Sequence, residues 1–72
     1  MYKVLTPRER EIFTLLIDNY STKQIAEKLN VSEKTIRNHI SNVILKLDAK
    51  GRTQALVKLL YIGELKIKAN DS

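Results

Sequence analysis

The side chains with the clearest chemistry lie between Ser32 and Leu47, where the sequence predicts one amphipathic helix. At about 100° per residue, its apolar positions share one stripe. These are Ile36, Ile40, Val43 and Leu47. The opposite face of its N-terminal half carries Lys34, Arg37, Asn38 and Ser41. Side chains of these types bond base edges and phosphates, so the pattern predicts a helix that enters a DNA major groove.

A second row of polar residues flanks this face. It consists of Thr35, His39, Asn42 and Lys46. His39 lies beside apolar positions, so a packed, hydrogen-bonded histidine is as consistent with the sequence as a phosphate contact. It is the only histidine in a chain without cysteine. A thiolate or histidine-based metal site is therefore not expected, and no cofactor is predicted.

The placement of charge favours a polyanionic partner. The formal net charge is +5. Basic and acidic side chains balance over residues 1–20, whereas residues 21–54 carry seven basic and three acidic side chains, an excess of four. This excess surrounds the predicted helix, as phosphate binding requires. Many small domains are mildly basic, so charge alone does not decide between nucleic acid and an ordinary solvated surface.

The chain before this helix begins with a helix predicted over about 7–19. Thr6 can cap it, Pro7 suits its first position, and Glu9 stands where a capping-box carboxylate reaches back. Apolar residues then recur at helical spacing, while Arg10 is predicted on the outer side. The segment is therefore expected to pack one face on a core.

A shorter helix is predicted over 22–29, because Ser21 and Gln24 repeat the capping-box pattern. Asn30 tolerates the left-handed conformation that a tight turn needs, and Ser32 caps the next helix, over 33–47. Ala26 is small where the two helices would cross. Together these features predict a helix-turn-helix.

A fourth helix is predicted over 52–63, and from Ala55 to Ile62 its only charged residue is Lys58. One side carries Ala55, Leu56, Leu59 and Ile62. Much of the remainder carries Val57, Leu60 and Tyr61. A helix that is apolar nearly all round is buried on more than one side, which in so small a domain favours a homodimer. The alternative is that several of these side chains are merely half exposed.

The predicted fold class is therefore all-α, with one four-helix domain over residues 1–67 and a disordered tail over 68–72. No apolar run approaches the roughly 20 residues of a membrane helix, and no signal-peptide pattern is present. We expect a cytoplasmic protein without a membrane partner or small-molecule ligand. No nucleophile–base set, paired carboxylates or glycine-rich phosphate loop is apparent, so no catalytic site is predicted.

Several separated blocks resemble the LuxR/FixJ/NarL-type DNA-binding domain. They are LTPREREI at 5–12, TKQIA at 22–26, SEKTIRNHI at 32–40, KL at 46–47 and RTQA at 52–55. The resemblance covers about residues 4–65 and is strongest to family members that stand alone and control sporulation and spore-coat genes. It implies a transcription regulator that dimerises through the fourth helix, binds two promoter half-sites and contacts RNA polymerase.

Carried over by position, the resemblance implies base contacts at Arg37, Asn38 and Ser41. Ser41 departs from relatives with a basic residue there, and its short hydroxyl reaches a base only through water or approaches the backbone. The implied phosphate contacts are Lys23, Lys34, Thr35, His39 and Lys46, with backbone amides at helix starts adding to them. The implied dimer positions are Val57, Leu60 and Tyr61.

Three alternatives stay open at this point. Arg52 either touches DNA or forms an ion pair with Glu9 or Glu11, and we expect the ion pair. The chain could be a DNA-binding domain taken from a two-component response regulator. The same helices could instead bind a protein, and steep salt dependence of binding to DNA would exclude that interpretation.

Overall fold

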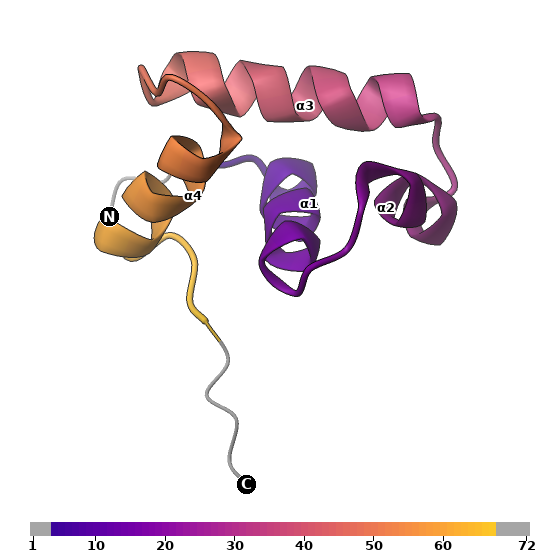
Figure 1. Ribbon diagram of the computed structural model, residues 1–72, viewed down its shortest axis with the longest axis horizontal. Helices are drawn as coiled ribbons and strands as arrows, with labels where there is room; N and C mark the ends of the chain where they lie inside the picture. Colours follow the sequence, from indigo (N-terminus) through magenta and orange to yellow (C-terminus); the bar gives the residue numbers. More distant parts are fainter. Residues whose placement is uncertain (1–3, 68–72) are drawn as a thin grey trace, which may run out of the picture.

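The computed structural model describes residues 4–67, and these form four helices with no strand (Figure 1). Their bounds are α1 Pro7–Ile17, α2 Thr22–Leu29, α3 Glu33–Lys46 and α4 Arg52–Tyr61. The all-α, four-helix prediction is confirmed. None of the helices in residues 4–67 is long and apolar enough to cross a membrane. The predicted tail over 68–72 lies outside the described residues, as do residues 1–3.

The first helix begins where the capping pattern predicts. Thr6 Oγ1 accepts from the Glu9 amide at 3.1 Å, and Glu9 Oε1 accepts from the Thr6 amide at 2.9 Å. The helix ends at Ile17 rather than near Asn19, because Asn19 takes a φ of 70° that a right-handed helix cannot contain. The predicted end of α4 at 63 is also late, since the helix stops at Tyr61 before Gly63 at a φ of 82°.

The helix-turn-helix forms through the turn that the sequence predicts. Asn30 closes α2 with φ 59° and ψ 47°, which is left-handed. The Val31 amide then donates to the Ala26 carbonyl at 3.0 Å. Ser32 Oγ accepts from the Thr35 amide at 3.1 Å and so begins α3. Local residues therefore set where α3 starts and how it leaves α2.

The core lies beneath α3, which contacts each of the other three helices and runs across them in Figure 1. The largest fully buried side chains are Phe13, Ile12, Ile25, Ile36, Leu59 and Val43. They come from all four helices. Because α3 packs one face on this core, its opposite face remains open to solvent.

A buried carboxylate ties α1 to the end of α3. Glu9 is 4% exposed, and Lys46 Nζ donates to its Oε1 at 2.6 Å and to the Val4 carbonyl at 3.2 Å. Glu11 is paired with Arg8 at 3.3 Å. The expected ion pair of Arg52 with Glu9 or Glu11 is therefore wrong. Lys46 reaches Glu9 from the last turn of α3, whereas Arg52 is exposed.

A second ionic contact joins α1 to the segment after α4. The Arg10 guanidinium binds both the carboxylate and the backbone carbonyl of Glu64. The same carboxylate accepts from the Val4 amide at 2.9 Å. Arg10, predicted on the outer side of the helix, is 36% exposed, and it meets Glu64 because the chain folds back after Gly63 and buries Leu65 to 5% exposure.

Candidate nucleic-acid interface

The outward face of α3 presents the four polar side chains that the sequence groups together. Lys34, Arg37, Asn38 and Ser41 are all exposed, and we call these four residues the α3 polar face. The inward positions of the same helix are Ile36, Ile40 and Val43, which are at most 4% exposed. The helix therefore divides into a face that packs on the core and a face that is free to bind.

Arg37 is oriented within this face by a weak neighbour contact. Its Nη2 lies 3.3 Å from Glu33 Oε1, four residues earlier, and the two side chains are 57% and 40% exposed. Exposed pairs at this spacing contribute about 0.3–0.5 kcal/mol. The guanidinium can therefore leave Glu33 for a DNA base at little cost.

Thr35 and His39, which flank the α3 polar face, are less exposed than its four residues. Thr35 is half-buried, and its hydroxyl lies 3.0 Å from Ser32 Oγ at the start of α3. His39 is half-buried, and its ring forms no hydrogen bond with residues 4–67. Lys23 is exposed in the first turn of α2, the helix that precedes α3 in the helix-turn-helix.

Lys46 differs from the other predicted phosphate contacts. Two of its three ammonium donors are used by Glu9 and Val4. Burial works to raise the pKa of the Glu9 carboxyl, but the hydrogen bonds from Lys46 and Thr6 outweigh it and lower that pKa. The geometry gives Lys46 an internal role, so a phosphate contact from it stays a prediction. The sequence offered no sign of this pair, because 37 positions separate its members.

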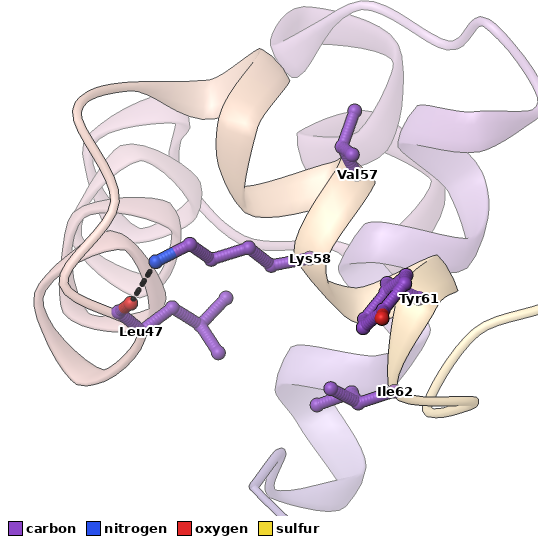
Figure 2. Close-up of a pocket in the computed structure, with 5 residues that line it drawn as sticks. All are labelled: Leu47, Val57, Lys58, Tyr61 and Ile62. Carbon is purple, nitrogen blue, oxygen red and sulfur yellow. Dashed lines mark hydrogen bonds between the residues drawn. The ribbon is translucent and has the colours of Figure 1, made fainter.

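The exposed side of α4 carries an apolar hollow lined by Leu47, Val57, Lys58, Tyr61 and Ile62 (Figure 2). We call it the α4 hollow. Val57, Tyr61 and Ile62 are 57%, 90% and 52% exposed. Ile62, which was predicted within the fourth helix on the side of Ala55 and Leu59, is instead the capping residue beyond the last turn.

Leu60 lies apart from the α4 hollow. It is half-buried and packs against the core. On a helix, Leu60 is turned about 100° from Tyr61, whereas Val57 and Tyr61 are four residues apart and share a side. Of the three predicted dimer positions, the structure thus brings Val57 and Tyr61 together at the surface and places Leu60 toward the core.

Comparison with known proteins identifies the family. A family model described as "Bacterial regulatory proteins, luxR family" matches residues 3–59. The chain belongs to the luxR family of bacterial regulatory proteins. A solved structure described as "Structure of Transcription factor, GerE" superposes with a TM-score of 0.89 at 57% identity, covering 93% of this chain and all of that one.

Curated relatives of this luxR-family chain fall into two size classes. It is 58% identical over 64 residues to the spore germination protein GerE of Bacillus subtilis, covering 89% of this chain and 86% of that protein. It is 43% identical over 65 residues to the transcriptional regulatory protein DegU of Brevibacillus brevis. That match covers 90% of this chain but only 28% of DegU.

The fold and the family together establish the general activity. The chain is a GerE-like DNA-binding transcription regulator of the luxR family, and its relatives are regulators rather than enzymes. Its helix-turn-helix presents the α3 polar face, which is the surface on which DNA contacts are expected.

Proposed function

We propose that this luxR-family regulator binds promoter DNA as a homodimer, with the α3 helix of each copy in one of two successive major grooves. The observation that carries the proposal is the α3 polar face, four exposed side chains on the helix surface opposite the core. A recognition helix in this kind of fold contacts bases through its N-terminal half. Lys34, Arg37 and Asn38 all lie within that half of α3.

Each side chain of this surface has a role that follows from its chemistry. Arg37 donates two parallel hydrogen bonds to a guanine, and Asn38 pairs with an adenine or contacts a phosphate. Ser41 reaches a base through water. Lys34 and Lys23 neutralise phosphates, with Thr35 and His39 beside them. The Thr35 hydroxyl contacts both Ser32 and a DNA phosphate.

The homodimer is supported by the α4 hollow. An exposed apolar surface on a soluble domain indicates an interaction site. Val57 and Tyr61 supply its most exposed apolar area, and a tyrosine buries a large apolar surface when covered. A second copy docked through the same surface gives a two-fold dimer, which matches two half-sites of opposite orientation. Leu60 packs against the core and so holds α4 in place behind this surface.

The regulated genes are proposed from similarity. The identity of 58% to the spore germination protein GerE favours control of sporulation and spore-coat genes. The regulator then acts in the bacterial cytoplasm on nucleoid DNA, with RNA polymerase as its partner at the promoter.

Selection of bound sequences from random DNA tests the proposal. We expect enrichment of two half-sites with centres about 34 Å apart, or a multiple of it. Affinity for the selected site should fall steeply with salt, because each neutralised phosphate releases counterions. Enrichment of a lone half-site would exclude the dimer and keep the DNA interface. Absence of binding to any DNA at low salt would exclude both.

A further inference from the structure

The ammonium group of Lys58 donates hydrogen bonds to backbone carbonyls at the C-terminal end of α3. Its Nζ donates to the Leu47 carbonyl at 2.9 Å, drawn in Figure 2, and to the Asp48 carbonyl at 3.4 Å. Lys58 belongs to α4, whereas both acceptors belong to the turn that follows α3. One side chain therefore joins α4 to the turn at the end of α3.

The end of α3 needs such a donor. The amides of Leu47, Asp48 and Ala49 turn back onto carbonyls of the last turn, which they satisfy. The carbonyls of Leu47 and Asp48 are not among these acceptors. Asp48 takes a left-handed φ of 54°, so the helix cannot continue through it. A cation at this position also meets the negative end of the helix dipole. Lys58 thus supplies both the hydrogen bonds and the favourable charge.

The same lysine lines the α4 hollow. Its stem lies beside Leu47 in that hollow, and Val57, Tyr61 and Ile62 complete the lining (Figure 2). Lys58 is half-buried before any partner arrives. Because its ammonium already donates to two carbonyls, a second copy can cover the stem without leaving these two donors unsatisfied.

We propose that Lys58 is a positioning residue that sets the angle between α3 and the dimer surface, and thereby determines which half-site spacing the homodimer accepts. This inference rests on the proposed homodimer. In a two-fold dimer the separation of the two recognition helices depends on how each is held relative to the shared interface. The Lys58 contacts cross that junction from the middle of α4, and a second bond, from the Lys50 amide to Gln54 Oε1 at 2.8 Å, crosses it at the start of α4.

The test compares the wild-type protein with Lys58→Met and Lys58→Arg. Lys58→Met keeps the stem and removes the ammonium, and Lys58→Arg restores a donor. Lys66→Met removes the same charge at an exposed position outside α4 and serves as the control. Affinity is measured on DNA with two half-sites over a series of spacings, and on DNA with one half-site. Sedimentation establishes that each protein is dimeric at the concentrations used.

We expect Lys58→Met to lose about tenfold in affinity at the best spacing, because α3 is then less firmly positioned relative to the dimer surface and must be ordered on binding. The preference of Lys58→Met among half-site spacings should become weaker, while its affinity for DNA with one half-site should stay within about twofold of wild type. Lys58→Arg should recover the wild-type spacing preference. An unchanged spacing profile, or the same loss on one half-site, would overturn the inference.

A Lys58→Met protein that is monomeric would also overturn it, since Lys58 would then act in the interface contact itself. A wild-type protein that dimerises but binds no DNA would remove the proposed function and this inference with it. If the wild-type dimer prefers one half-site spacing and Lys58→Met shows the same preference, only the proposed role of Lys58 is refuted.

Discussion

Arg37 is the side chain for which the proposed DNA contact makes the most specific prediction. In the free protein its guanidinium rests against Glu33 at 3.3 Å on an exposed helix surface. A guanine offers two acceptors that match two guanidinium donors. The proposed exchange of Glu33 for a guanine costs little, because the contact with Glu33 is exposed to water.

Arg37→Ala is therefore expected to cost about 1–3 kcal/mol on the selected operator and to relax preference at one base position. Titration of operators with single base-pair changes measures both effects. Lys34→Ala is the matched comparison, since it removes one charge from the same face and should weaken all sequences alike. If Arg37→Ala also weakens every sequence equally, Arg37 contacts a phosphate instead.

Glu9 is the residue at which pH should affect folding. Burial acts to raise its pKa, but hydrogen bonds from Lys46 and Thr6 lower it below the ordinary value of 4.5. A carboxyl whose pKa is lower in the folded state stabilises the fold above its ordinary pKa. That contribution disappears as the pH falls through the lowered value.

We expect Glu9→Gln to reduce stability by about 1–2 kcal/mol at neutral pH, because Lys46 and Thr6 lose a charged acceptor. It should also reduce the further loss of stability in acid, below about pH 4.5. Thermal unfolding followed across pH measures both. Glu11→Gln is the control, since its pair with Arg8 is exposed. Identical pH profiles for the two variants would exclude Glu9 as the responsible group.

At the scale of elements, the geometry of the helix-turn-helix depends on the left-handed Asn30. A branched side chain at its φ of 59° would clash with the backbone. We expect Asn30→Val to cost about 1–2 kcal/mol, whereas Asn30→Gly should change stability by only a few tenths. Denaturant unfolding gives both values. Equal effects of the two substitutions would mean that backbone conformation at this turn is not the limiting factor.

In the molecule as a whole, α3 packs one face on the core and leaves the opposite face exposed, while α4 carries an exposed apolar hollow (Figures 1 and 2). Tyr61 is 90% exposed in that hollow, so replacing it leaves the core intact. Leu60 is a poorer probe, because it is half-buried and an aspartate there would also harm the core.

Tyr61→Asp is expected to yield a folded monomer by light scattering. Its affinity for DNA with two half-sites should fall about a hundredfold or more, since linked binding is lost. Leu45→Asp is the control for oligomeric state, because Leu45 is 78% exposed on α3 rather than α4. A Tyr61→Asp protein that remains dimeric would exclude the α4 hollow as the interface.

Local sequence patterns were sufficient to predict the helices, their starts and the residues of the α3 polar face. Those features depend on neighbours three or four residues apart, such as the Thr6–Glu9 and Ser21–Gln24 capping boxes. The left-handed turn at Asn30 and the burial of Ile36 and Val43 follow from the same local patterns. Helix ends were less predictable, since Asn19 left the helix early.

The pairing of distant charges and the open side of α4, in contrast, depend on how the complete helices pack. Lys46 meets Glu9 across 37 positions and Arg10 meets Glu64 across 54, and no periodic pattern connects such residues. The hollow that includes Leu47 and Ile62 appears only when the turn after α3 lies against α4. These contacts depend on how complete helices pack, which local spacing does not specify.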